Sequence, residues 1–138
     1  MPSANQIVNH MMTNDAFSQW LDIEVLEASP GHAKLKMVVR PEMTNGFAIA
    51  HGGITYSLAD SALAFASNGH GMHGVSIETN ISHTKPVKSG DELTAIVEEK
   101  NKTRKIGLYE VSVFNQNQEM VALFKGTVYF TGKEWTIE

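Results

Sequence analysis

The residue with the clearest chemical signal is an aspartate inside an apolar segment. Asp60 lies between Leu58-Ala59 and Ala62-Leu63. Removing a carboxylate from water at such a position is costly unless the group is paired or used. A carboxylate placed there is suited to attack an electrophilic carbon or to activate a water molecule for that attack. The structural alternative is that Asp60 lies at the edge of a helix and contacts only water or a lysine.

A second chemical signal is the run His51-Gly52-Gly53, directly before the segment that contains Asp60. If a helix begins here, its free backbone N–H groups and its dipole favour an oxygen atom that gains negative charge. One well-placed donor to such an oxyanion stabilises a transition state by roughly 3–4 kcal/mol. The paired glycines also leave room for the close approach of a ligand. The alternative is that they serve only to permit a tight loop.

The spacing of the two signals has a structural consequence. Gly52 and Asp60 are eight positions apart, which is about 12 Å along a helix axis. An attacking carboxylate, or its water, must lie roughly 3 Å from the carbonyl carbon whose oxygen is bound at Gly52. The two residues of one chain therefore cannot act on the same carbonyl group. If both act in one reaction, two helices run past each other in opposite directions, and the site spans a twofold dimer with two sites per pair.

Two helices are predicted. From residue 52 to about residue 67 almost every side chain is apolar or small, which is typical of a helix buried on all sides. The glycine-rich residues 68–74 end this helix. An amphipathic helix is predicted near the N-terminus, with an apolar face formed by Ile7, Val8, Met11 and Met12.

The other segments alternate between apolar and polar residues, as half-buried strands do. Strands are predicted at 33–39, 75–81, 93–97, 109–113 and 120–130, after an extended segment at 22–28. Long strands and one fully apolar helix predict an α+β fold. In this fold a curved antiparallel sheet wraps around the central buried helix.

Composition limits the class of protein. The 138 residues suffice for one domain, residues 1–138, and the chain has no cysteine. Disulfides, a thiolate nucleophile and a zinc–thiolate site are therefore excluded. The net charge of −4 argues against nonspecific binding to nucleic acid. With no signal-peptide pattern and no apolar stretch long enough to span a membrane, we expect a cytoplasmic protein without a membrane partner.

The residues around both chemical signals resemble those of a known family, the hotdog-fold acyl-CoA thioesterases of the phenylacetate-degradation (PaaI-like) type. The pattern is Asn45, five residues, His51-Gly52-Gly53, six residues and Asp60. The resemblance extends over nearly the whole chain through segments 14–16, 57–62, 85–86, 90–91 and 121–126. It implies the hotdog fold and hydrolysis of an acyl-CoA thioester without a metal or redox cofactor, coenzyme A being part of the substrate.

The resemblance also implies roles for individual residues. It makes Asp60 the catalytic carboxylate, acting as nucleophile or as general base on water. It makes the backbone N–H of Gly52 the group that polarises the thioester carbonyl, with Asn45 and His51 orienting the substrate around it. Ser76 is similar to a hydroxyl that some members use to hold the attacking water, the alternative being simple exposure.

Further residues are expected to contact the substrate. Gly53 leaves room for the ligand beside Gly52. Ser61 stands where relatives often have threonine and keeps the hydroxyl, while Phe47 lies in a part that varies within the family and is expected to tune the acyl pocket. Basic side chains near turns or strand ends suit the phosphates of coenzyme A, the alternative being an ordinary solvated surface. They are Lys85, Lys88, Lys102, Arg104 and Lys105.

Two further patterns lead to no site. Residues 69–74 match G-x-G-x-x-G, but they follow a helix and precede a strand, the reverse of the order in a dinucleotide-binding unit, so a flexible loop is predicted. His70, His73 and His83 are candidate metal ligands. No carboxylate or cysteine completes the set at a suitable spacing, so no metal site is predicted.

Three functions remain to be distinguished. Thioester hydrolysis is the leading hypothesis. The nearest enzymatic alternative is a hotdog hydratase or dehydratase, in which His51 and an acid move a proton on carbon. A non-catalytic acyl-CoA sensor is the third, but a pure binder gains nothing from the desolvation of Asp60. Apolar faces on both sides of the sheet predict that homodimers pair further into tetramers.

Overall fold

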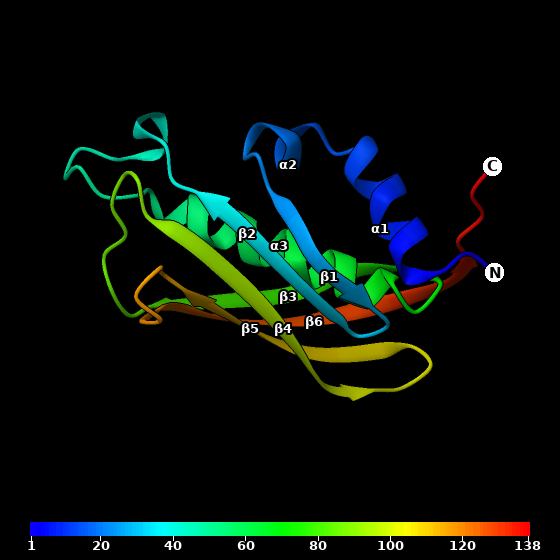
Figure 1. Ribbon diagram of the computed structural model, residues 1–138. Coiled ribbons are helices and arrows are strands. Elements are labelled where there is room, and N and C mark those ends of the chain that lie inside the picture. Colours follow the sequence, from blue (N-terminus) through cyan, green and yellow to red (C-terminus); the bar gives the residue numbers. More distant parts are fainter.

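A curved sheet and its central helix dominate the structure, a computed structural model that describes all residues 1–138. Six antiparallel strands curve around one long helix, and two short helices lie beside one edge of the sheet (Figure 1). The helices are α1 (Ala4–Thr13), α2 (Ala16–Trp20) and α3 (Gly52–Asn68), with a 3-10 turn η1 (Pro41–Met43). The strands are β1 (Glu24–Ser29), β2 (His32–Val38), β3 (Met72–His83), β4 (Glu92–Lys102), β5 (Ile106–Phe114) and β6 (Met120–Glu134).

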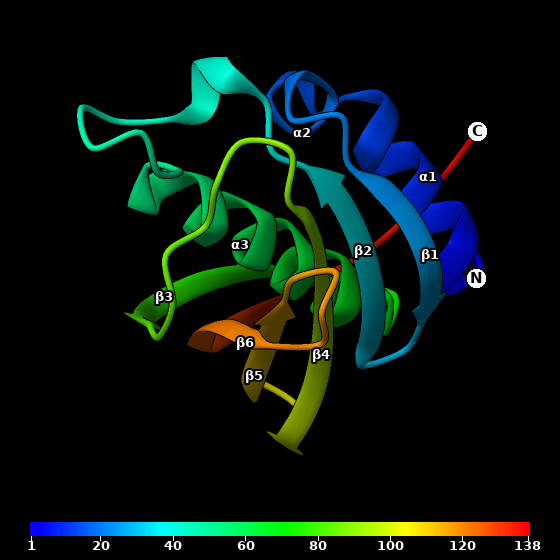
Figure 2. The same ribbon diagram turned by 60° about the vertical axis from the view of Figure 1, so that its left-hand side comes forward.

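The order of the strands in the sheet is β1-β2-β4-β5-β6-β3. α3 connects β2 to β3 and crosses the concave face between them, where it contacts all six strands (Figure 2). The predicted architecture, a curved antiparallel sheet around a buried helix, is confirmed. The order leaves β1 and β3 as the two edge strands.

One row of side chains shows which face of the sheet packs against α3. It runs across four neighbouring strands from Leu35 through Ala95 and Val113 to Ala122, and all four side chains are fully buried. The row ends on β3 at His83, the register partner of Ala122. Because successive strand residues point to opposite faces, His83 belongs to the inner face.

α3 is apolar on nearly its whole circumference, as predicted. Leu58, Leu63 and Phe65 are fully buried in the core that the helix shares with the sheet. A Cβ atom at Gly126 of β6 would come within 2.6 Å of Leu63 Cδ2, so glycine permits this close approach of sheet and helix. No helix of the structure combines the length and the hydrophobicity that crossing a membrane requires.

The predicted N-terminal helix is confirmed, and a second helix that hydrophobic periodicity does not reveal follows it. α1 begins with a capping box, in which Ser3 Oγ accepts the Gln6 N–H and Gln6 Oε1 accepts the Ser3 N–H. α2 has only five residues, too few to show an apolar period. Its one sequence signal is the N-cap Asp15, whose carboxylate accepts the Ser18 N–H.

The predicted strands are present, and several are longer than their apolar alternation indicates. β4 continues to Lys102 and β6 to Glu134. The added residues are mostly exposed on both faces, so they lack the alternation by which a half-buried strand is recognised.

The prediction of a flexible loop over residues 69–74 is wrong for half of that segment. α3 ends at Asn68, and β3 already begins at Met72. The buried Asn68 side chain accepts the Gly74 N–H and donates to the Gly74 carbonyl oxygen. These two bonds fix the start of β3 against the end of the helix.

Candidate active site

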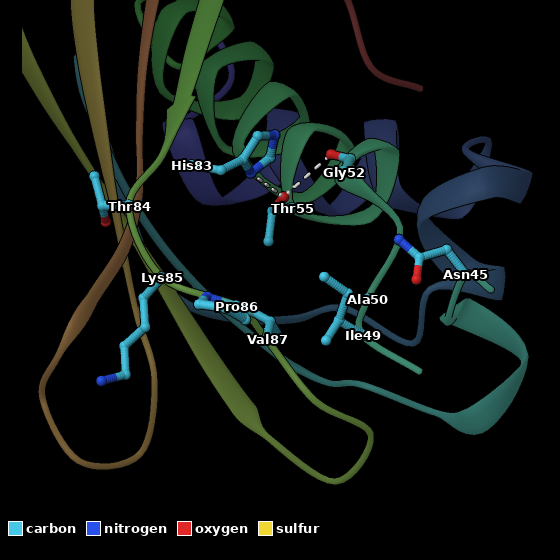
Figure 3. A pocket seen from close by; sticks show the side chains of 10 residues that line it. All are labelled: Asn45, Ile49, Ala50, Gly52, Thr55, His83, Thr84, Lys85, Pro86 and Val87. Atoms are coloured by element: carbon cyan, nitrogen blue, oxygen red, sulfur yellow. Dashed lines mark hydrogen bonds between the residues drawn. The ribbon is translucent and has the colours of Figure 1, made fainter. Parts of the chain in front are cut away.

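A cavity of about 330 Å³ lies at the start of α3 (Figure 3). Three segments border it: the loop before α3, the first turn of α3 and the chain that leaves β3. The Ala50 N–H donates to the Val87 carbonyl oxygen and joins two of these segments. The residues that line the cavity are Asn45, Ile49, Ala50, Gly52, Thr55, His83, Thr84, Lys85, Pro86 and Val87.

The first N–H groups of α3 differ in whether they have a partner. His51 is the N-cap residue: its Nδ1 accepts the Gly53 N–H at 3.1 Å, and its carbonyl oxygen accepts the Ile54 N–H at 2.8 Å. The N–H of Gly52 has no acceptor in the chain, and Gly52 borders the cavity. A free N–H at a helix start is suited to bind a developing oxyanion, which is the role predicted for Gly52.

Asn45 shapes the loop in front of the helix and reaches the same cavity. Its Oδ1 accepts the Phe47 N–H at 2.9 Å, and its backbone groups bond to Ala48 and Ile49. The side-chain Nδ2 has no partner in the chain and is turned toward the start of α3 (Figure 3). Ala48 has a φ of 61°, a left-handed conformation that is uncommon outside glycine. The loop is therefore held in a strained form beside the cavity.

Phe47 does not join this cavity within one chain. Its side chain is 85% exposed, and it is absent from the lining residues. The role predicted for Phe47, to tune the acyl pocket, is therefore not met by the geometry of the single chain.

A second cavity, of about 240 Å³, lies further along α3. Asp60 and Ser76 both border it, so the structure brings these two predicted residues together. Burial raises the pKa of the Asp60 carboxyl group, and the nearby carboxylate of Asp15 raises this pKa further. Carboxylates with raised pKa values are common among catalytic acids, bases and nucleophiles. The cavity is completed by Leu63, Ala64, Ser67, Gly74, Val75 and Val128.

Asp15 reaches α3 through a short chain of hydrogen bonds that no motif in the sequence reveals. Its carboxylate accepts both the N–H and the hydroxyl of the buried Ser18. Ser18 Oγ lies 2.8 Å from Ser61 Oγ, so the Ser61 hydroxyl faces α2. Ser61 therefore ties α3 to the N-terminal helices, and this placement does not support the predicted contact with substrate.

The basic residues expected to bind coenzyme A do not form one cluster in the chain. Lys85 borders the first cavity, and its Nζ lies 2.7 Å from Glu119 Oε2. Lys88 precedes β4, whereas Arg104 and Lys105 follow it in the next turn. Because a strand of eleven residues is roughly 35 Å long, the two groups lie at opposite ends of the sheet.

The three histidines of the rejected metal site lie in three separate places. His70 Nε2 lies 2.5 Å from Glu99 Oε2, and His73 stacks on an aromatic ring near the C-terminus. His83 is hydrogen-bonded to Thr55 in the first cavity. No group of three metal-ligating side chains comes together in the structure. Sequence patterns do not indicate His83 and Thr55, although both line the first cavity. The register of the sheet places His83 there, next to Thr55 of α3.

Comparison with known proteins identifies the family. The family model described as the thioesterase superfamily matches residues 47–122. Acyl-coenzyme A thioesterase PaaI of Escherichia coli is 35% identical over 127 residues, which cover 92% of this chain and 91% of that protein. A putative esterase of Archaeoglobus fulgidus is 38% identical over 130 residues, which cover 94% of this chain and 84% of that protein.

Solved structures that resemble this chain include one of its sequence relatives. The structure of the E. coli PaaI protein from the phenylacetic acid degradation operon matches with a TM-score of 0.94 and covers 96% of each chain. The structure of smu.793 from Streptococcus mutans, bound to acetyl CoA, is 26% identical and matches with a TM-score of 0.79, covering 82% of this chain and 91% of that one. The family match includes Gly52, Asp60 and His83. On this combined evidence the chain belongs to the thioesterase superfamily, as a PaaI-like thioester hydrolase with the hotdog fold.

Proposed function

We propose that the protein hydrolyses acyl-CoA thioesters to a free carboxylic acid and coenzyme A. The name of the E. coli relative and the acetyl CoA bound to the S. mutans relative support this choice of substrate class. One observation carries the proposal. A single helix bears a free N–H group at its start and, at its middle, a half-buried carboxyl group whose pKa is raised.

In the proposed reaction the thioester carbonyl oxygen accepts the N–H of Gly52, and Asn45 and His51 orient the substrate around it. Asp60 either attacks the carbonyl carbon or takes a proton from the water that does. Ser76 holds that water beside the carboxylate. A C–O bond forms, the C–S bond breaks, and the departing thiolate takes up a proton. The oxygen of one water molecule ends in the acid, and no metal or redox cofactor takes part.

The unpaired edge of β3 supports the proposal that two copies of the chain form the site. No strand pairs with its outer edge, and Val75 and Ile77 are 53% and 59% exposed. Long apolar edges of this kind are suited to pair with another chain. Because Val75 and Ser76 border the cavity of Asp60, a second copy paired along β3 lies next to this carboxylate. Twofold symmetry then brings the partner's helix start to it.

The outer face of the sheet supports further pairing of such dimers into tetramers. Tyr129 is the register partner of Val75 on one side and of Ile106 on the other, and Leu108 lies on the same strand as Ile106. Val75, Leu108 and Tyr129 are exposed. Light scattering coupled to size-exclusion chromatography distinguishes the monomer, dimer and tetramer.

A thiol-release assay over acetyl, medium-chain, benzoyl and phenylacetyl CoA thioesters tests the proposed activity. We expect release of free coenzyme A from at least one of them. Hydration of an enoyl-CoA without release of thiol would assign the protein as a hydratase. Tight binding of thioesters without turnover would assign it as a sensor, and either result would overturn the proposal.

A mixed dimer of two inactive variants tests whether the site spans two chains. Asp60→Asn removes the carboxylate, and Gly52→Pro removes the N–H donor. Proline is tolerated in the first turn of a helix, and His51, at φ −58° and ψ 138°, already has the conformation preferred before proline. One of the two sites of the mixed dimer then has both intact groups.

The two variants are produced together with different affinity tags, so that mixed dimers can be isolated. We expect mixed dimers to show about half of the wild-type activity, because one of two sites is rebuilt. If each site is built within one chain, both sites of the mixed dimer lack a group and the mixed dimer stays as inactive as its parents.

A further inference from the structure

The peptide group between Gly52 and Gly53 is held by hydrogen bonds at both of its ends. On the N–H side, His51 Nδ1 accepts from Gly53 at 3.1 Å. On the carbonyl side, Thr55 Oγ1 donates to the Gly52 oxygen, also at 3.1 Å. Figure 3 shows the second bond inside the cavity at the start of α3. We call this arrangement the peptide clamp: His51, Thr55 and the residue that supports Thr55.

That supporting residue is His83. Its Nδ1 lies 3.2 Å from Thr55 Oγ1. A hydroxyl group has one proton, and Thr55 donates this proton to Gly52, so Thr55 Oγ1 accepts from His83 and the proton of a neutral His83 ring is on Nδ1. The ring also limits residue 52: a Cβ atom there would lie 3.2 Å from His83 Nε2, tighter than ordinary van der Waals contact.

The clamp restricts the backbone freedom that the two glycines introduce at the helix start. Glycine has more backbone freedom than any other residue, and the first turn of a helix has few internal hydrogen bonds. A donor to an oxyanion is effective only when its direction is set before the reaction. The peptide that carries the Gly52 N–H is held on its carbonyl side, where the His51 oxygen accepts the Ile54 N–H at 2.8 Å. With glycine at both 52 and 53, the angle between this peptide and the next stays variable unless side chains also hold the peptide after Gly52.

We propose that Thr55 and His83 are positioning residues of the active site, which hold the peptide after Gly52 so that its preceding N–H stays aimed into the cavity. Thr55 is buried and lies in the first turn of α3. His83 comes from the far end of the inner row of the sheet. The helix start is thereby held in a fixed position relative to β3. This inference rests on the proposed function, in which the Gly52 N–H binds the oxyanion.

Paired substitutions test the clamp. Thr55→Val keeps the shape of the side chain and removes the hydroxyl, whereas Thr55→Ser keeps the hydroxyl. His83→Phe keeps a ring without nitrogen, whereas His83→Asn offers an N–H group near the position of Nδ1. Ser57→Ala is the matched control, because Ser57 Oγ donates to the carbonyl oxygen of Gly53, one peptide further along.

We expect Thr55→Val and His83→Phe each to lower kcat by roughly ten- to a hundredfold, since a small misplacement of a reacting group has effects of this size, with KM little changed. Thr55→Ser and His83→Asn should recover most of kcat, and Ser57→Ala should keep it. The double variant Thr55→Val/His83→Phe should be no slower than Thr55→Val, because both changes break the same chain of bonds. Wild-type kcat in Thr55→Val, or an equal loss in Ser57→Ala, would overturn the inference.

Amide hydrogen exchange separates the clamp from the proposed function. In Thr55→Val the Gly53 N–H should exchange faster than in wild type, while amides at the middle of α3 keep their rates. Unchanged exchange at Gly53 would overturn the clamp even if the protein is an active thioesterase. A wild type that releases no thiol from any thioester would overturn the function while the exchange result still decides the clamp.

Discussion

The two cavities along α3 differ in the electrostatic character of their key groups. At the start of the helix, the cavity holds a free N–H group and the positive end of the helix dipole. At the middle, the cavity holds a carboxyl group whose pKa is raised by burial and by Asp15. One set of groups suits an oxyanion and the other suits the attack that creates it. They are about 12 Å apart along the axis, too far for both to act on one carbonyl group within a single chain, so the proposed mechanism requires a second copy.

The largest expected effect of a single substitution is at the carboxylate. Asp60→Asn should lower kcat by roughly a hundred- to ten-thousandfold, the range typical for loss of a general base. Binding of the thioester should persist, because the variant keeps the shape of the side chain. Steady-state kinetics and calorimetric binding measure the two quantities. Full activity in this variant would remove the second cavity from the mechanism.

The donor side should be somewhat less sensitive. Gly52→Pro removes one N–H group and should lower kcat by roughly a hundred- to a thousandfold, as loss of one oxyanion donor does. Gly52→Ala places a Cβ at the same 3.2 Å from His83 Nε2 but keeps the N–H, and so measures the steric part of the loss. The measurement is kcat under saturating thioester, with circular dichroism to confirm the fold. A loss confined to KM would mean that Gly52 contacts the substrate without stabilising its transition state.

The edge strands give a test of whether the two cavities meet across a dimer. Ile77→Lys places a charge on β3, where lysine blocks strand pairing, and should cause about a tenfold loss of activity in dilute solution. Leu26→Lys makes the same change on the other edge strand, β1, and should keep both the dimer and the activity. Activity against protein concentration, together with light scattering, measures the effect. A monomeric Ile77→Lys variant with wild-type activity would rule out a shared site.

A smaller effect is expected from the charge near the second cavity. Asp15→Asn removes the negative charge that helps to raise the pKa of Asp60, so this pKa should fall toward its ordinary value. Because the proposed mechanism needs ionised Asp60, the acidic limb of kcat/KM should move to lower pH. Asp22→Asn is the control, since its φ of 58° suits asparagine and its charge is not among the causes of the shift. A profile that stays in place in Asp15→Asn would contradict the electrostatic link.

The smallest expected effect concerns stability. A carboxyl group with a raised pKa stabilises the fold in its protonated form, and this contribution is lost as the pH rises through the folded-state pKa. Asp60→Asn removes the ionised form, so at neutral pH its Tm should exceed that of the wild type. At a pH below the ordinary aspartate range the two should converge. Thermal unfolding at both pH values tests the sign, and a less stable variant at neutral pH would show that Asp60 is satisfied in the assembled protein.

Much of the fold and part of the site could be predicted from local patterns. The apolar run of α3 and the alternation in the strands give the architecture, because a segment buried on one face shows a period in the sequence and a helix buried on all faces is apolar throughout. Local patterns do not reveal α2, because five residues are too few to show a period, or the ends of β4 and β6, because these residues lie outside the core. The distribution of the basic residues over both ends of the sheet depends on strand order, which turn positions alone do not reveal.

By itself, the sequence determined the helix, its donor at Gly52, its carboxylate at Asp60 and the distance between them, since all of these depend on positions a few residues apart. Only the tertiary structure decided which groups surround them. His83 meets Thr55 across 28 positions of the chain, and Ser18 meets Ser61 across 43. Such contacts follow from strand order and from the packing of helices on the sheet. They leave no local spacing in the sequence, because they join residues that are far apart along the chain.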